Sequence, residues 1–280
     1  MHHPIPLRLL PALLVMMLAA FAACTEPSGA SPRDLITLTR DSITLVVDPN
    51  RGGRLSSLTY GGQEVLSTGD DSTGYSVGSV AWYSPQEDWN WPPPATFDRA
   101  AFSVQRVEKH SVLLISDRDS LTGLVLQKRY RLGPDSDIGL TYWLTNKGDT
   151  TVSVAPWEVT RIPYDGTITF FSDSLRTLSG KPLTESDDSL HVVHLDERHT
   201  GKGKLFASLD SIPVTYVRDG LRFEKHTVVT DYYRVAPGQA PLEIYVDPAR
   251  RFAEFELQGD YRTLGYDQTT TLRTRWVLGR

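Results

Sequence analysis

The sequence predicts an all-β fold, a large antiparallel β-sandwich with little helix. Two observations lead to this prediction. Short segments rich in Val, Ile, Thr, Tyr and Phe recur along the chain, and most are bounded by Gly, Pro, Asp or Asn. No segment sustains the 3.6-residue apolar period of an amphipathic helix. A sandwich commonly runs to about 200–250 residues as one domain, so we predict a single domain over residues 34–280.

The predicted strands follow one another closely along this domain. The first segment, ITLTRDSITLVVDP at 36–49, alternates apolar and polar residues, as a half-buried strand does. Similar segments lie at 101–117, 124–134, 138–148, 150–159, 166–173, 214–229, 242–248, 252–259 and 270–279. Gly61 and Gly62 stand between two short runs, which predicts a two-residue hairpin turn. The polar segment 179–203 is predicted as a long excursion from the sheets.

The N-terminus has the layout of a bacterial lipoprotein signal. Residues 1–23 contain the apolar run LLPALLVMMLAAFAA, which is too short and wrongly flanked for a membrane span. Cys24, the only cysteine, follows small residues in AFAAC, which resembles a lipobox with Phe21 in place of the usual Leu. We predict a lipoprotein signal peptide (1–23), then a lipidated Cys24 and a flexible tether (24–33). The alternative is a simple signal peptide, with Cys24 incidental.

Lipidation at Cys24 would place the protein in the bacterial cell envelope, lipid-anchored and facing the periplasm or the cell exterior. The membrane is then contacted through the N-terminal lipid alone. A formal net charge of −5 without a basic stripe argues against nucleic acid as a partner. His191, His194 and His199 match no compact zinc spacing, so the sequence predicts neither a metal site nor a cofactor.

The segment WYSPQEDWNWPPP, at 82–94, points to a binding site. It holds three of the six tryptophans and ends in three prolines, which are incompatible with a helix interior or a central strand. Aromatic rings stack on the apolar faces of sugar rings, and prolines hold such rings in place at low entropic cost. Trp82, Trp89 and Trp91 are therefore candidates for the wall of a sugar groove. The alternative is that they cap an open end of the sandwich.

Three longer stretches resemble the galactose-mutarotase-like superfamily, which includes the aldose 1-epimerases. They are VVDPNRGGRLSSLTYGGQEVL, GLTYWLTNKGDTTVSVAPWEVTR and LEIYVDPARRFAEFELQGD with the closing TTTLRTRWVL. The Trp-rich segment resembles an uncharacterised bacterial branch of this superfamily, catalogued as a domain of unknown function. The resemblance covers nearly all of residues 36–278. It implies a β-supersandwich with a sugar-sized groove on one sheet.

The resemblance also implies roles for individual residues. Mutarotases open and close a sugar ring with a general base, a Glu on a late strand, and a His as general acid. The segment FELQGD resembles the family's pattern around that Glu, which makes Glu256 the counterpart of the general base. Strand alternation adds that Glu254 and Gln258 share a face with Glu256, which makes Glu254 a candidate for contact with the substrate. The alternative is that these residues form the ordinary solvent-exposed face of a strand.

The general acid of the family has no counterpart here. Where a His is expected, the chain has Trp157 and Glu158. Glu158 qualifies as an acid only if burial raises its pKa, and His226 is the nearest His by strand context. Trp157 is a further candidate for contact with the sugar.

Two arginines are also candidates for contact with a sugar. The planar fork of arginine suits paired hydroxyls or a carboxylate, which makes Arg54 and Arg161 substrate-binding candidates, with structural ion pairs as the alternative. Lys225, on a predicted strand, is a weaker candidate for the site.

Three functions fit these observations. The first is an exported, lipid-anchored carbohydrate-binding protein with a Trp-walled groove that takes a sugar or glycan. The second is a sugar epimerase or lyase that uses Glu256 as its general base; whether the protein is an enzyme stays open, because the catalytic His is not matched. The third is a non-catalytic structural lipoprotein of the envelope.

Overall fold

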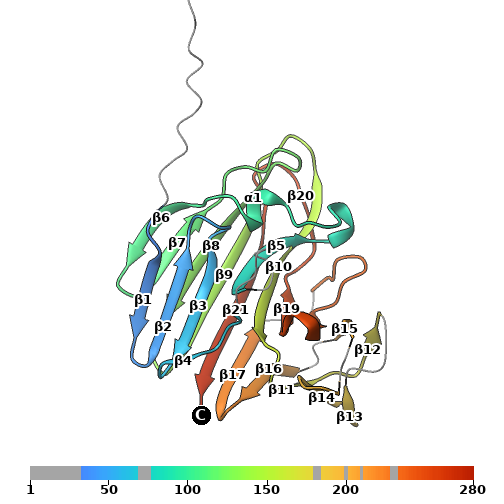
Figure 1. The fold of residues 1–280 in the computed structure, drawn as a ribbon. Helices are drawn as coiled ribbons and strands as arrows, with labels where there is room; N and C mark the ends of the chain where they lie inside the picture. Colours follow the sequence, from blue (N-terminus) through green and yellow to red (C-terminus); the bar gives the residue numbers. More distant parts are fainter. Residues whose placement is uncertain (1–32, 69–76, 179–183, 199–200, 209–210, 228–232) are drawn as a thin grey trace, which may run out of the picture. The chain divides into compact units, whose positions relative to one another are not determined.

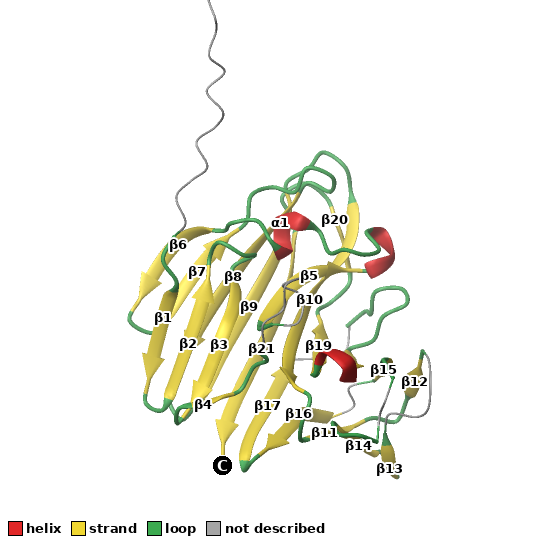
Figure 2. Cartoon of the chain, viewed as in Figure 1, coloured by secondary structure: helices red, strands yellow, loops and turns green. Residues whose placement is uncertain are grey.

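The structure, a computed structural model, describes residues 33–68, 77–178, 184–198, 201–208, 211–227 and 233–280. The predicted signal peptide, Cys24 and all of the tether except Arg33 lie outside the described residues. Residues 33–280 form one compact unit. Two antiparallel sheets make up this unit (Figures 1 and 2), so the predicted all-β fold is confirmed.

The first sheet has 11 described strands in the order β1-β2-β3-β5-β10-β19-β18-β15-β12, with β4 on β3 and β20 on β10. Their bounds are β1 (Ile36–Arg40), β2 (Ile43–Asp48), β3 (Arg54–Tyr60), β4 (Gln63–Glu64), β5 (Ser79–Ser84), β10 (Val152–Pro163), β12 (Leu175–Thr177), β15 (Gly203–Ala207), β18 (Leu242–Asp247), β19 (Phe252–Gln258) and β20 (Arg262–Leu264).

The second sheet has 10 described strands in the order β13-β14-β11-β16-β17-β21-β9-β8-β7-β6. Their bounds are β6 (Ser103–Glu108), β7 (Ser111–Ile115), β8 (Leu124–Leu132), β9 (Asp137–Asn146), β11 (Thr167–Phe171), β13 (Glu185–Asp187), β14 (Leu190–His194), β16 (Ser211–Arg218), β17 (Leu221–Thr227) and β21 (Thr269–Gly279).

Helix is confined to three single turns in the described residues, namely η1 (Gln86–Asp88), α1 (Ala95–Asp98) and η2 (Pro248–Arg250). None of these turns has the length and apolarity that a membrane-crossing helix needs. Pro94 caps the start of α1, where the missing N–H of proline is tolerated.

The predicted turn at Gly61 and Gly62 is confirmed. It joins β3 to β4 with both φ angles positive, at 57° and 81°, and glycine adopts such angles without a Cβ clash.

Two sequence expectations were wrong. Residues 82–84, which begin the Trp-rich segment where no strand was predicted, belong to a central strand, β5; this strand lacks alternation because all six of its residues are buried. The described part of 179–203 is not an excursion, since β13 and β14 pair into the second sheet. Short strands with mixed polarity, such as ESD at 185–187, carry too weak a pattern to be recognised.

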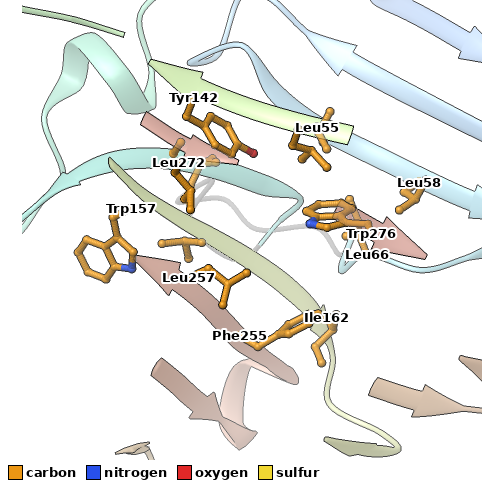
Figure 3. Packing of buried hydrophobic residues seen from close by; sticks show 14 of the residues in the cluster. Leu55, Leu58, Leu66, Tyr142, Trp157, Ile162, Phe255, Leu257, Leu272 and Trp276 are labelled. Carbon is orange, nitrogen blue, oxygen red and sulfur yellow. The ribbon is translucent and has the colours of Figure 1, made fainter. Parts of the chain in front are cut away.

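Apolar side chains fill the space between the two sheets (Figure 3). The ring of Phe255 on β19 lies 5.2 Å from that of Phe223 on β17, and Phe223 lies 5.1 Å from Trp276 on β21. These contacts join the first sheet to the second, so odd-numbered residues of β19 point into the core. Glu254 and Glu256 consequently lie on the outer face of the first sheet.

A buried ion pair crosses this core. Lys225 on β17 pairs with Glu158 on β10, and both side chains are fully buried. The Lys225 ammonium also donates hydrogen bonds of 3.0 Å to Thr160 Oγ1 and to the carbonyl of Phe255. Glu158 Oε2 accepts a hydrogen bond of 2.7 Å from Thr274. The pair therefore ties the central strands of one sheet to those of the other.

The strands at the sheet ends are short or polar. Among the described strands, β12 and β13 close one end of each sheet with three residues apiece. β13 consists of Glu185, Ser186 and Asp187, all exposed. At the opposite end of the second sheet, Arg106 and Glu108 on β6 are exposed charges.

Candidate functional site

The candidate site lies on the outer face of the first sheet, across five neighbouring strands. Strand β10 separates two roles by alternation: Trp157 and Arg161 point outward, and Glu158 points into the core. The register places Arg161 opposite Glu254, and Glu254 opposite Tyr245. Side chains from strands far apart in sequence therefore meet on one surface.

This surface holds a pocket of about 510 Å³. Its lining residues are Trp82, Gln86, Trp91, Trp157, Lys202, Lys204, Tyr245, Arg250, Phe252, Glu254 and Glu256. A hollow of similar volume beside β20 and β21 is lined by polar residues and Leu264, without an aromatic ring. The combination of aromatic rings and convergent polar groups makes the first pocket the better candidate.

Tryptophans form one wall of the pocket. The ring of Trp82 meets those of Trp157 and Trp91 edge to face, at centroid distances of 5.6 and 6.4 Å. Trp82 also donates a 3.2 Å hydrogen bond from Nε1 to Asp98, which fixes its orientation. Trp91 is 57% exposed at the rim. Trp89 packs against the core, donates to the carbonyl of Tyr83, and does not line the pocket.

Lys204, on β15, organises the polar wall. Its ammonium lies 2.6 Å from Glu243 Oε2 and 3.2 Å from Glu256 Oε2. It also lies 5.0 Å from the ring of Trp157. Glu243 is held in turn, because its Oε1 accepts hydrogen bonds from Gln258 and from the backbone N–H of Ala240. These contacts fix the ammonium at the boundary between the aromatic and acidic parts of the pocket.

A second ion pair lies beside Lys204. The Nε of Arg161 donates a 2.7 Å hydrogen bond to Glu254, and the guanidinium lies 5.4 Å from the ring of Trp82. Two cations, Lys204 and Arg161, thus face three carboxyl groups, those of Glu243, Glu254 and Glu256. Two further cations of the pocket lining, Lys202 and Arg250, both contact Asp247.

Glu256 has a carboxyl group with a raised pKa. Burial raises the pKa of this carboxyl to about 8, against the opposing effect of Lys204 and with further increases from Glu243 and Glu254. Burial lowers the pKa of Lys204, but the acidic groups around it, Glu243 among them, outweigh burial and raise it above its usual value. At neutral pH the carboxyl of Glu256 is therefore mainly protonated, and in this form it can donate a proton. The sequence resemblance implied the opposite role, that of a general base.

Buried polar atoms at the pocket lack intramolecular partners. Among the described residues, neither Glu256 Oε1, Trp157 Nε1 nor Arg161 Nη1 finds a hydrogen-bond partner. Buried polar atoms of proteins are paired in the great majority of cases, and exceptions are frequent at functional sites. Glu256 and Trp157 line the pocket, and Arg161 contacts the lining residue Glu254, so two of these atoms belong to side chains that face a ligand in the pocket.

Four residues predicted for the site do not line the pocket, namely Trp89, Arg161, Glu158 and Arg54. Glu158 belongs to the buried ion pair with Lys225 inside the sandwich, so neither reaches the pocket. Arg54 is 1% exposed and donates to the carbonyls of Arg51 and Asp98. Its guanidinium lies 3.5 Å from the Asp98 carboxylate that also holds Trp82. Arg54 therefore supports the aromatic wall from behind and does not line the pocket.

None of the described histidines lines the pocket. His226 lies on the second sheet and faces Glu224 at 3.1 Å, while the pocket is on the first sheet. His191 contacts the carbonyl of Ser172, and His194 lies 3.5 Å from Glu185. His199 lies outside the described residues. Within the described part of the chain, no group of three or more His, Cys, Asp or Glu is arranged to hold a metal ion.

Sequence reasoning missed Lys204 and Glu243, which fix the polar wall. Glu243 stands in LEIYVDP, whose alternation places it and Tyr245 on the face opposite Leu242 and Ile244, so a signal for it was available. Lys204 is in a five-residue strand, GKLFA, whose pairing with β18 no local pattern reveals.

Solved structures resemble this fold over most of the chain. A protein described as an aldose 1-epimerase from Escherichia coli K12 matches with a TM-score of 0.65 at 16% identity, over 88% of this chain and 99% of that chain. A galactose mutarotase-like protein from Lactobacillus casei matches with a TM-score of 0.65 at 14% identity, over 88% and 100% of the two chains. The fold is galactose mutarotase-like. A homologue of aldose epimerase from Caenorhabditis elegans has the same fold, with a TM-score of 0.58 at 11% identity, over 88% and 99% of the two chains.

The comparisons of sequence add no family. No family model matches the chain. A protein of Arabidopsis thaliana named for ribonuclease H is 31% identical over 189 residues, which are 61% of this chain. The match spans only 28% of that plant protein, so it assigns neither family nor activity. The galactose mutarotase-like fold, which covers most of this chain, is the stronger guide.

Proposed function

We propose that this protein is an exported, lipid-anchored carbohydrate-binding protein that holds a sugar in the pocket on its first sheet. The observation that carries the proposal is the combination of Trp82, Trp91 and Trp157 with a polar wall formed by Lys204 and Glu256 in one pocket. Aromatic faces suit the C–H faces of a sugar ring, and fixed charged groups select its hydroxyls. The galactose mutarotase-like fold supports this choice of ligand.

Export and anchoring rest on the N-terminal sequence. The apolar run, the single cysteine in AFAAC and the polar tether motivate the envelope location. The assignment to an uncharacterised bacterial branch of the superfamily is likewise a prediction from the sequence alone.

A saccharide screen tests the binding function. The purified full chain, in a detergent without a sugar headgroup, is titrated with monosaccharides and short glycans while intrinsic tryptophan fluorescence is followed. We expect saturable binding of at least one saccharide, abolished or strongly weakened by Trp157→Ala. Absence of binding to every saccharide would overturn the proposal and favour the structural interpretation.

One observation favours interconversion of sugar anomers as a second candidate. With a pKa of about 8, the Glu256 carboxyl exchanges its proton near neutral pH, as a general acid–base group must. Glu254 projects from the same face of β19 two residues away. Polarimetry of freshly dissolved α-glucose and α-galactose tests this candidate: Glu256→Gln should abolish any acceleration of mutarotation while weakening saccharide binding less.

A further inference from the structure

A second hollow adjoins the pocket. It has a volume of about 490 Å³, and three of its lining residues, Gln86, Trp91 and Lys204, also line the first pocket. The shared residues come from the turn after β5 and from β15. Two hollows that share three lining side chains lie side by side, and the two together are here called the groove.

Lys204 stands at the junction of the two hollows. Its ammonium lies 5.0 Å from the ring of Trp157, which lines the first hollow, and 5.5 Å from the ring of Phe206, which lines the second. Trp91, 57% exposed, borders both hollows. A cation and an aromatic ring at the shared border provide contacts for a ligand that passes from one hollow into the other.

The walls of the second hollow are held by specific contacts. The guanidinium of Arg176 on β12 lies 3.9 Å from the ring centroid of Phe206 and donates a 3.1 Å hydrogen bond to the carbonyl of Gly238. Gln239, which follows Gly238, also lines the hollow. Its buried Oε1 has no hydrogen-bond partner among the described residues. As in the first hollow, a buried polar group is left for a ligand to satisfy.

The combined size exceeds the needs of a monosaccharide. Sites for small molecules occupy about 300–1,000 Å³, and each hollow alone falls within that range. A single sugar ring would occupy one hollow and leave the other, with its own aromatic and polar groups, unused.

We infer that the groove binds an oligosaccharide, with at least one sugar unit in each hollow and the linkage between them passing Trp91 and Lys204. The inference rests on the proposed function, since it names the class of carbohydrate that the same site takes. It adds Phe206 and Gln239, on the far side of Lys204, as residues that determine preference for chain length.

Calorimetric titration with saccharides of increasing length tests the inference. The probes are series built from glucose, from mannose and from N-acetylglucosamine, each running from the monosaccharide to the tetrasaccharide. For the series that binds, affinity should rise about tenfold or more between the monosaccharide and the tetrasaccharide, because the longer ligand reaches both hollows.

Variants in the second hollow separate its contribution from that of the first. Phe206→Leu, which removes the flat ring but keeps an apolar side chain, should abolish most of the gain with length and leave monosaccharide affinity unchanged. Gln239→Ala should also reduce the gain in affinity with saccharide length. Because Gln239 lies in a partly exposed turn, this variant should fold like the wild type. Phe171→Leu is the matched control, since Phe171 lies exposed on β11 of the other sheet.

The outcomes distinguish the inference from the proposed function. Equal affinity for all lengths, or unchanged tetrasaccharide affinity in both second-hollow variants, would overturn the inference while monosaccharide binding upheld the function. If no saccharide of any length binds, the proposed function fails and the inference fails with it.

Discussion

Trp91 combines two properties that make it the most informative single residue. It is more than half exposed, yet it lies at the border of both hollows and meets Trp82 edge to face. Its position lets it contact a ligand in either hollow, and a saccharide is the ligand that we propose.

Trp91→Ala should weaken saccharide binding about tenfold or more, because loss of an aromatic face contributes on the order of 1 kcal/mol or beyond. Its exposure means that the thermal unfolding midpoint should change little. Trp143→Ala, on the second sheet, is the matched control and should leave affinity intact. Equal losses in the two variants would mean that Trp91 does not contact the ligand.

Glu256 gives the protein a pH dependence of defined sign. Its pKa is about 8 in the folded protein, against a usual value of 4.5. Between these values the folded state binds more protons than the unfolded state, so the free energy of unfolding falls as pH rises. The stabilisation that Glu256 contributes is fully present below about pH 4.5 and is lost as the pH rises from there through about 8.

Glu256→Gln, which is neutral at every pH, should flatten this part of the profile. Urea unfolding at about pH 5, 6.5 and 8 measures the slope. Glu87→Gln, at an exposed position in η1, is the control and should keep the wild-type slope. A Glu256→Gln slope as steep as the wild type would show that another group titrates in this range.

At the scale of elements, β10 has the central place. Its outward-facing Trp157 lines the pocket, and its inward-facing Glu158 pairs with Lys225 of β17, which links the sheets. Breaking a buried ion pair leaves one charge uncompensated in a low-dielectric core, which is more damaging than removing both charges.

Glu158→Leu should therefore lower the free energy of unfolding by about 3–5 kcal/mol. The double variant Glu158→Leu with Lys225→Met should recover most of that loss, since no charge remains buried. Equilibrium urea unfolding measures the free energy of unfolding of the single and the double variant. Removal of the exposed pair Lys147–Asp267 is the control and should leave the midpoint almost unchanged. Equal stability of the single and double variants would contradict this account.

Sequence predicted elements better than it predicted which face each element buries. Alternation correctly grouped Glu254 and Glu256 on β19, because the apolar residues Phe255 and Leu257 mark the core side of that strand. On β10 nearly every residue is buried, so Glu158 gives no sign that it points inward. The same two-sided burial concealed β5 and the strand position of Trp82.

For the whole molecule, the fold followed from repeated short β segments, whereas the site depends on pairing across the sheet. Lys204 lies far from Glu256 in sequence and meets it only through the β15-β18-β19 register. Such non-local pairing leaves no local pattern, so Lys204 appeared only in the structure, whereas the alternation of LEIYVDP carried a signal for Glu243.

Cys24→Ser tests the proposed anchoring of the whole molecule. We expect wild-type protein in the membrane fraction, with a lipid mass on its N-terminal residue, because acyl chains contribute about 0.8 kcal/mol for each buried methylene. The variant should lose the lipid and leave that fraction. Mass spectrometry of the N-terminus decides, and an unmodified Cys24 in the wild-type protein would overturn the proposal.

The short, polar strands at the sheet ends bear on behaviour in concentrated solution. A long apolar edge offers unpaired backbone groups on which another copy adds a strand, and this is how β proteins aggregate. Here β12 and β13 offer only three residues each, and β13 presents two acidic side chains. Arg106 and Glu108 place charges along β6 at the other end of the second sheet. These three end strands therefore disfavour addition of a second chain.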